Sequence, residues 1–147
     1  MKKAITIVLL LAVFVTSLCG CMQKPPVTIT TGNLEEYFTV KTTVKNDFVS
    51  DNIFITAIIK VSVDAKEKMD VDSLVVKGTI DIYEKYWSRL HENGKLPVKV
   101  NIIVDNTGHG EIEKKLSYIP QSHFSDYYKD DDYYFTCKSA SGIVTLM

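Results

Sequence analysis

The stretch Ile53–Val63, IFITAIIKVSV, decides the fold of this chain. Every second residue in it is apolar, and β-branched side chains dominate, which is typical of a strand with a buried face. Phe54 and Ile58 occupy the opposite face, so the pattern indicates a central strand partly covered on both sides. A helix is the competing interpretation of so long an apolar run, and the strict alternation disfavours it. The residues expected on the buried face are Ile53, Ile55, Ala57, Ile59, Val61 and Val63.

Alternation of the same kind recurs on both sides of this stretch, and Gly78 interrupts it where a bulge or a close backbone approach is expected. We expect the last two strands to pair with each other around Ser139-Ala140-Ser141. Seven or eight strands and no long amphipathic helix predict an all-β fold, a single antiparallel β-sandwich. The further strands are predicted at Val27–Thr30, Phe38–Lys45, Leu74–Tyr83, Val98–Val104, Glu111–Leu116, Tyr133–Lys138 and Gly142–Leu146.

Polar and turn-forming residues separate these strands. Asn33–Tyr37 predicts one helical turn with Asn33 as N-cap and Glu36 as its reciprocal partner, and Tyr37 and Phe38 are expected to plug one end of the core. Asp105–Gly108 predicts a hairpin turn. The other breaks are expected at Asn46-Asp47, Ser50–Asn52, Asp64–Asp72, Asn93-Gly94 with Pro97, and Pro120–Asp132.

The N-terminus has the layout of a secretory signal. Lys2 and Lys3 precede the apolar run Ala4–Leu18, which is shorter than the roughly 20 residues of a membrane span. The run ends in Leu18-Cys19-Gly20-Cys21, which resembles the lipobox of bacterial lipoproteins, with Cys19 where alanine, serine or threonine is usual. The resemblance implies cleavage before Cys21 and a diacylglyceryl group on its thiol. Soluble export and a retained span remain the alternatives.

The same resemblance predicts how the chain is divided and where it resides. Residues 1–20 would be the signal peptide, 21–26 a tether stiffened by Pro25-Pro26, and 27–147 the β-sandwich domain. One acyl chain binds a membrane only reversibly, so the two fatty acyl chains of a diacylglyceryl group, such as palmitate, would give a stable anchor at Cys21. We therefore expect the domain on the extracytoplasmic face of the cell membrane.

Two further resemblances concern the domain itself. The strand pattern resembles the immunoglobulin-like sandwiches of exported bacterial proteins, although the Cys–Trp–Cys signature of true immunoglobulin domains is absent. The segment Asn33–Phe38 is similar to the opening of small uncharacterised lipoproteins of low-GC Gram-positive bacteria. That family implies no biochemical function for this chain.

Charge and cysteine content exclude some functions. The chain has 17 lysine and arginine residues against 18 aspartate and glutamate residues, and no basic stripe, which disfavours a nucleic-acid partner. Arg89 is the single arginine. With Cys19 removed and Cys21 lipidated, Cys137 is left without a disulfide partner. Its strand context favours a small buried hydrophobe over a reactive thiol.

No stretch predicts catalysis or a cofactor. The acidic run Asp126–Asp132 could begin a calcium shell, but it lacks the spacing and the glycine of a calcium loop, so a solvated loop is the favoured interpretation and no metal site is predicted. His91, His109 and His123 are spread over three predicted loops without metal-ligand spacing. Because no catalytic motif accompanies them, we expect a protein that is not an enzyme.

Aromatic residues give the strongest indication of a binding site. Tyrosine, tryptophan and arginine are enriched in binding hot spots, and aromatic faces also stack on sugars. The alternative is that half of the aromatics fill the core, with Tyr133 and Phe135 on one face. The sequence therefore predicts a non-enzymatic binding module for a protein or glycan; a structural accessory subunit that pairs through a strand edge and a calcium-dependent carbohydrate-binding module are the alternatives. The candidate binding residues are Tyr83, Tyr86, Trp87, Arg89, Tyr127 and Tyr128.

Overall fold

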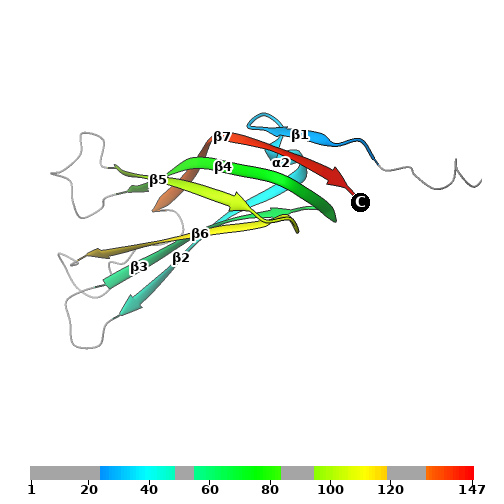
Figure 1. The fold of residues 1–147 in the computed structure, drawn as a ribbon. Helices are drawn as coiled ribbons and strands as arrows, with labels where there is room; N and C mark the ends of the chain where they lie inside the picture. The colour runs from blue at the N-terminus through cyan, green and yellow to red at the C-terminus, as the bar shows by residue number, and fades with distance from the viewer. Residues whose placement is uncertain (1–23, 49–54, 84–94, 119–131) are drawn as a thin grey trace, which may run out of the picture.

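The computed structural model describes residues 24–48, 55–83, 95–118 and 132–147 (Figure 1). This part of the chain forms seven strands and one short helix, which confirms the predicted all-β class. No helix within it is long and apolar enough to cross a membrane. The predicted signal peptide and Cys21 lie outside the described residues. The elements are β1 (Val27–Thr30), α2 (Leu34–Tyr37), β2 (Phe38–Phe48), β3 (Ile55–Ala65), β4 (Met69–Tyr83), β5 (Lys95–Val104), β6 (His109–Tyr118) and β7 (Tyr133–Leu146).

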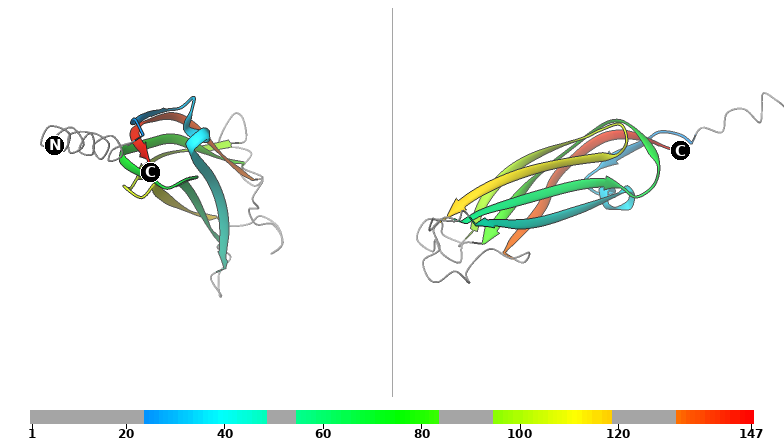
Figure 2. Two further views of the ribbon diagram at one scale, coloured as in Figure 1. Left: turned by 90° about the vertical axis from the view of Figure 1, so that its right-hand side faces the viewer. Right: turned by 90° about the horizontal axis from the view of Figure 1, so that it is seen from below.

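The strands form two antiparallel sheets that lie one over the other (Figures 1 and 2). The four-stranded sheet has the order β1-β7-β4-β5, and the three-stranded sheet has the order β2-β3-β6. Buried side chains from both sheets form one hydrophobic cluster between them. This arrangement is consistent with the predicted β-sandwich.

The core confirms the expectation from the deciding stretch. β3 is the central strand of its sheet, and Ala57, Ile59, Val61 and Val63 on its inner face are at most 1% exposed. Burial of each isoleucine or valine side chain stabilises the fold by about 1.5–3 kcal/mol, and burial of the smaller alanine side chain stabilises it less. Ile58 is half-buried on the outer face. From the facing sheet, β4 contributes Leu74, Val76, Ile80 and Ile82, as the alternation predicted.

Three predicted breaks are wrong because the strands run further than their apolar residues. β3 continues to Ala65 and β4 begins at Met69, so the loop predicted over Asp64–Asp72 shrinks to Lys66–Lys68. Asn46-Asp47 lies inside β2, opposite β3. Pro97 lies inside β5, at the edge of its sheet, where proline is tolerated because ladder hydrogen bonds form on one side only.

β7 is one continuous strand, which corrects the expected pairing around Ser139-Ala140-Ser141. It pairs with β4 along most of its length and with β1 over Ser141–Val144. Lys77 lies opposite Ser139 and Gly78 lies opposite Cys137, so Lys138 is the extra residue of a β-bulge. The close approach predicted at Gly78 is confirmed, since a Cβ there would lie 2.3 Å from the ring of Phe135.

The turn Asp105–Gly108 forms as predicted, but it is not a hairpin within one sheet. Asp105 Oδ1 accepts hydrogen bonds from the backbone N–H of Thr107 at 2.9 Å and of His109 at 3.1 Å, and Gly108 has a φ of 89°. After the turn, β6 pairs with β3 and not with β5. The chain therefore crosses here from the four-stranded sheet to the three-stranded sheet.

The predicted capping box at α2 is wrong. Asn33 makes no side-chain capping bond to the helix. Its Oδ1 accepts the N–H of Thr30 at 2.7 Å and its Nδ2 donates to the carbonyl oxygen of Thr28 at 3.0 Å. Asn33 thus closes the turn that follows β1. Phe38, which comes directly after α2, is 1% exposed and plugs the core as predicted.

The two ends of the sandwich differ in what they carry. The proximal end is where β1 begins and β7 ends, because Val27 lies opposite Val144 (Figure 1). The distal end is where β2, β4 and β6 end and β3, β5 and β7 begin, as the pairs Phe48–Ile55, Tyr83–Lys95 and Ile82–Tyr133 show. β4, with 15 residues, spans about 50 Å from end to end.

Candidate functional site

Tyr83 is the one predicted binding residue that the structure describes. Tyr86, Trp87, Arg89, Tyr127 and Tyr128 lie outside the described residues, as does the predicted lipidation site Cys21. Tyr86, Trp87 and Arg89 follow the end of β4, and Tyr127 and Tyr128 precede the start of β7; we call these two stretches the aromatic segments. The strand ends that border them are described, and they show what surrounds Tyr83.

Tyr83 lies beside a second exposed tyrosine at the distal end of the four-stranded sheet. Tyr83 is 39% exposed and Tyr134 is 64% exposed. Tyr134 lies opposite Asp81, and the N–H of Tyr83 donates to the carbonyl oxygen of Asp132 at 2.6 Å, so the tyrosines are diagonal neighbours on adjacent strands. The end of β4 that leads into one aromatic segment therefore lies beside the start of β7 that follows the other.

The prediction that some aromatics fill the core is also confirmed. Tyr133 is 3% exposed and belongs to the hydrophobic cluster, and Phe135 packs against that cluster from the same face of β7. Alternation along β7 thus separates Tyr134, which faces outward, from its two neighbours. Of these three aromatic residues, Tyr134 alone is exposed.

A cavity of about 240 Å³ opens beside Tyr134, at the side of the sandwich where β7 faces α2 and β2. Phe135 and Leu34 supply apolar walls, and Glu35 supplies a carboxylate. The cavity is large enough for a single side chain or a small organic group. Its lining residues are Thr31, Leu34, Glu35, Val40, Thr42, Tyr134, Phe135 and Cys137.

Cys137 is a half-buried free thiol in the wall of this cavity. Burial raises the pKa of the Cys137 thiol, and the nearby carboxylate of Glu35 adds to that effect. A thiol with a raised pKa stays protonated at neutral pH and is a poor nucleophile. The packing of Cys137 against the core agrees with the small hydrophobe predicted from the sequence.

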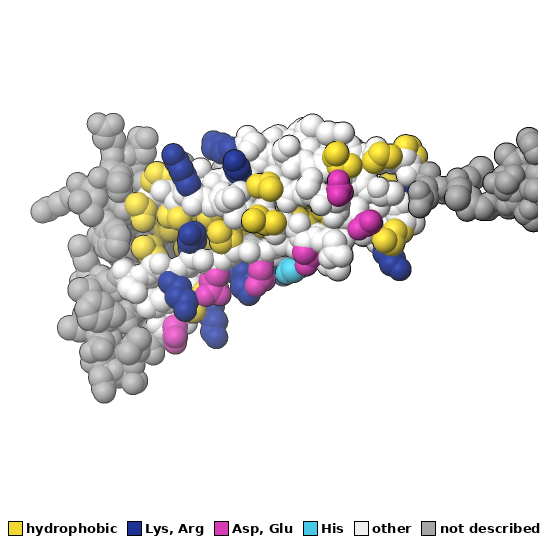
Figure 3. Space-filling model, viewed as in Figure 1, with side chains coloured by type: hydrophobic (Ala, Val, Ile, Leu, Met, Phe, Trp, Pro, Cys, Tyr) yellow, Lys and Arg dark blue, Asp and Glu magenta, His cyan; other side chains and the backbone are white. Residues whose placement is uncertain are grey.

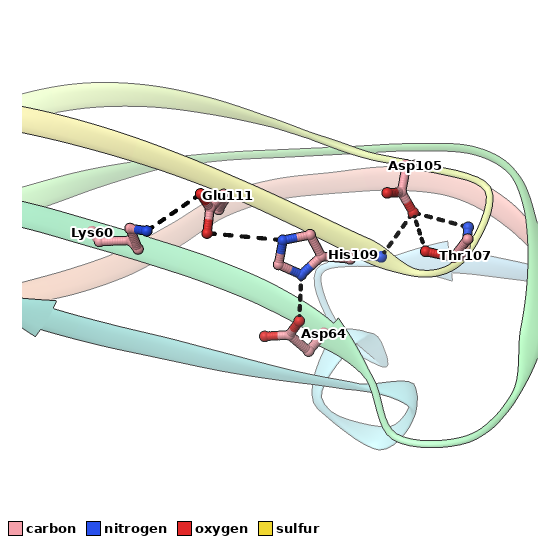
Figure 4. A network of polar contacts seen from close by, with 6 residues as sticks. All are labelled: Lys60, Asp64, Asp105, Thr107, His109 and Glu111. Atoms are coloured by element: carbon pink, nitrogen blue, oxygen red, sulfur yellow. Dashed lines mark hydrogen bonds and ion pairs between the residues drawn. The ribbon is translucent and has the colours of Figure 1, made fainter.

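A row of charged side chains follows the outer face of the three-stranded sheet (Figure 3). His109, at the start of β6, places Nδ1 at 2.6 Å from Asp64 Oδ1 on β3 and Nε2 at 3.8 Å from Glu111 Oε2 (Figure 4). Glu111 also accepts a hydrogen bond from Lys60 Nζ at 3.3 Å. His109 was predicted in a loop and is a strand residue; its pairing depends on the crossing of β6 to the other sheet, which has no local sequence signal.

The row is an exposed cross-strand network of charged side chains. The hydrogen bond from His109 and its charge lower the pKa of the Asp64 carboxyl, and the same bond raises the pKa of His109. Both side chains are about half exposed, and neither belongs to the lining of the cavity beside Tyr134. Within those residues, no three histidine, cysteine or acidic side chains gather closely enough to hold a metal ion. Of the acidic run Asp126–Asp132, Asp132 alone is described, and it is 2% exposed.

The network predicts a pH-dependent contribution to stability. The pKa of His109 is raised in the folded protein. Its ion pair therefore adds fully to the free energy of unfolding at pH values below the pKa of the unfolded histidine, about 6.5, and this stabilisation is lost as pH rises through the pKa of the folded state. The pKa of Asp64 is lowered in the folded protein. Its stabilisation of the fold is therefore present above the pKa of an unfolded aspartate, about 3.9, and is lost as pH falls through the lower pKa of the folded state. Glu111 and Asp105 also favour the charged imidazole.

We therefore expect His109→Gln to lower the melting temperature most between about pH 4 and pH 6.5, and least above pH 8. Thermal unfolding of the two proteins across this pH range measures the difference. Thr43→Gln, on the exposed face of β2, is a control that should show no such pH profile. A difference that does not vary with pH would contradict the ion pair.

No protein-family model, curated protein or solved structure matches the chain. The candidate site therefore has to be interpreted from its own geometry. That geometry consists of two outward-facing tyrosines at the distal end and a cavity beside one of them.

Proposed function

We propose that this protein is a membrane-anchored extracytoplasmic lipoprotein whose domain is a non-enzymatic binding module. The observation that carries the proposal is the separation of the two ends of the domain. The chain enters the domain at the proximal end, and the exposed tyrosines lie at the distal end. An anchor at Cys21 would hold the proximal end near the membrane and leave the distal end, with its exposed tyrosines, facing away from it.

The length of the domain supports display away from the membrane. Lys24, Pro25 and Pro26 are exposed and lead into β1 at the proximal end. Strands of the length of β4 place the distal end about 50 Å from that point. A diacylglyceryl group on Cys21, followed by a short proline tether, would leave the distal end accessible to a protein or a glycan.

The chemistry of the distal end supports recognition through aromatic contacts. Tyr83 and Tyr134 are outward-facing neighbours, and tyrosine combines a large apolar ring with a hydroxyl at small conformational cost. The segments with Tyr86, Trp87, Arg89, Tyr127 and Tyr128 adjoin the strand ends that carry this pair. We propose that residues of both segments extend the binding surface that the two tyrosines begin.

The immunoglobulin-like character of the domain is also a proposal. Its division into four and three strands supports it, because constant-type immunoglobulin domains divide their strands in the same way. The strand order limits the likeness, since β1 pairs with β7 and not with β2. The proposed likeness to immunoglobulin-like sandwiches therefore rests only on the division of the strands into sheets of four and three.

A structural accessory subunit is the second candidate function, and the edge of β7 favours it. β1 pairs with only four residues of β7, Ser141–Val144. From Tyr133 to Ala140, β4 is therefore the single strand that pairs with β7 among the described residues. Lys138 is the one charged residue of that segment. A strand edge with a single charge can accept a strand from a partner.

One experiment in intact cells tests the proposal, with three versions of the chain. The wild-type protein should incorporate a fatty-acid probe and fractionate with membranes. Cys21→Ala should abolish the labelling and release or mislocalise the protein, because the thiol is the acceptor of the anchor. Labelling that persists in Cys21→Ala would move the modification site or remove the claim of an anchor.

The third version, Tyr134→Ala, tests binding. Because the Tyr134 side chain is 64% exposed, its removal should leave folding and anchoring unchanged. Crosslinking from intact cells should recover a partner with the wild-type protein and at least about tenfold less of it with Tyr134→Ala. Equal recovery would exclude the tyrosine pair and leave the strand edge of β7 as the favoured contact.

A further inference from the structure

Three lysines surround an open hollow on the outer face of the four-stranded sheet. They come from three adjacent strands: Lys77 from β4, Lys99 from β5 and Lys138 from β7. The hollow measures about 490 Å³, and Thr79 and Asn101 add a hydroxyl and an amide to its lining. We call it the lysine hollow; its lining residues are Lys77, Gly78, Thr79, Lys99, Val100, Asn101 and Lys138.

The β-bulge of β7 brings two of these charges together. Lys138 is the extra residue between Cys137 and Ser139, so it lies beside the step from Lys77 to Gly78 of β4. Lys138 and Ser139 are both exposed, although consecutive strand residues normally face opposite sides. Bulges re-aim side chains and commonly lie beside functional sites.

No carboxylate among the described residues forms an ion pair with any of these lysines. Their cross-strand neighbours are uncharged: Asn101 and Ser139 lie opposite Lys77, and Thr79 lies opposite Lys99. Like charges on neighbouring strands repel each other and lower stability. Asp81 lies two residues along β4 from Thr79 on the same face, but no ion pair joins it to Lys99. The hollow therefore gathers three positive charges that no described carboxylate pairs with.

The other sheet of the same domain is arranged in the opposite way. There, Lys60 pairs with Glu111 at 3.3 Å and Lys115 lies 3.8 Å from Glu113. Figure 3 shows lysines and acidic side chains mixed along that sheet, whereas on the upper left of the four-stranded sheet no acidic side chain of a described residue is seen beside the lysines. One sheet pairs its lysines with acidic side chains, and among the described residues the other leaves these three lysines without an ion pair, so the lysine hollow can accept an anion.

We propose that the lysine hollow binds a phosphate group of an organic anion. Three ammonium groups supply charge-assisted hydrogen bonds, and the Thr79 hydroxyl and the Asn101 amide supply two further donors. A hollow of about 490 Å³ exceeds the size of a phosphate ion and falls within the range of small-molecule sites, so the phosphate is attached to an organic group. The proposal does not depend on the lipid anchor or on the tyrosine pair.

Phosphorus-31 NMR of the purified full chain in detergent tests this proposal. Glucose 6-phosphate is the probe, and glucose, which lacks the phosphate, is observed by proton NMR as its matched control. The phosphorus resonance should broaden with wild-type protein, and sodium chloride should reverse the broadening because exposed charges are screened by salt. Glucose resonances should remain sharp.

Two double variants with the same change in net charge make the test specific. Lys77→Gln with Lys138→Gln removes two charges from the hollow and should weaken binding at least about tenfold. Lys41→Gln with Lys45→Gln removes two exposed charges from β2 and should leave binding unchanged. The hollow variant should melt no lower than wild type, because the lysines it loses repel each other.

Two results would overturn the proposal: no broadening with wild-type protein, or equal broadening with both double variants. A second probe distinguishes the sources of the phosphate. Glycerophosphoglycerol, the deacylated headgroup of phosphatidylglycerol, carries a diester. Tighter binding of the diester than of glucose 6-phosphate would assign the hollow to a lipid headgroup, and the reverse order would assign it to a soluble phosphate ester.

Discussion

Replacing Phe38 with alanine is expected to lower the free energy of unfolding by about 3–5 kcal/mol. Phe38 is 1% exposed and is among the largest fully buried side chains of the described residues. It begins β2 opposite Ala65, directly after α2, so strand pairing and the helical turn hold its backbone in place. The vacated space would remain largely unfilled because the surrounding structure can collapse only in part. Thermal and urea unfolding followed by circular dichroism measure the loss.

Two companion variants show whether burial is the cause. Phe38→Leu keeps most of the apolar volume and should cost less than Phe38→Ala. Ile103→Ala removes a side chain that is 71% exposed on β5 and should change stability by less than about 0.5 kcal/mol. If Phe38→Ala unfolds at the same temperature as Ile103→Ala, the position of Phe38 in the core is wrong.

The fold class could be predicted because its signal is local. Along β3 and β4 the inward residues, such as Ile59, Val61 and Ile80, recur with a period of two, and each is at most 1% exposed. That period depends only on strand geometry, so it is visible in sequence without knowledge of the strand's partners. The order of the strands does depend on the partners and was not predicted.

The errors at strand ends and at the bulge have one physical cause. Strands of this domain extend past their apolar residues: Asp64 is about half exposed and Asn46 is half-buried, and both polar residues belong to strands. Ser139-Ala140-Ser141 resembles a turn in composition, yet Ala140 is 8% exposed and faces the core. Backbone pairing decides both cases, between β2, β3 and β6 for Asn46 and Asp64 and with β4 for β7, and the sequence of one strand does not contain its partner.

The candidate sites were predictable only in part for the same reason. Aromatic composition indicated Tyr83, and the register of β4 and β7 adds Tyr134 as its neighbour. Lys77, Lys99 and Lys138 are far apart in the sequence, and each alone is an ordinary strand lysine. The lysine hollow exists because three strands and a bulge bring them together.

Replacing Gly142 with alanine should lower the free energy of unfolding by about 3 kcal/mol. A Cβ at Gly142 would lie 2.0 Å from the carbonyl oxygen of Ser73 and 2.6 Å from Cα of Leu74. Both are backbone atoms of β4, so relief requires β7 and β4 to separate where their register shifts between Val71 and Ser73. Gly32→Ala is the matched control, since its nearest neighbour would be Thr30 Oγ1 at 3.8 Å, and it should unfold like wild type. Equal melting temperatures for the two variants would contradict the close approach of β7 to β4 on which the whole four-stranded sheet depends.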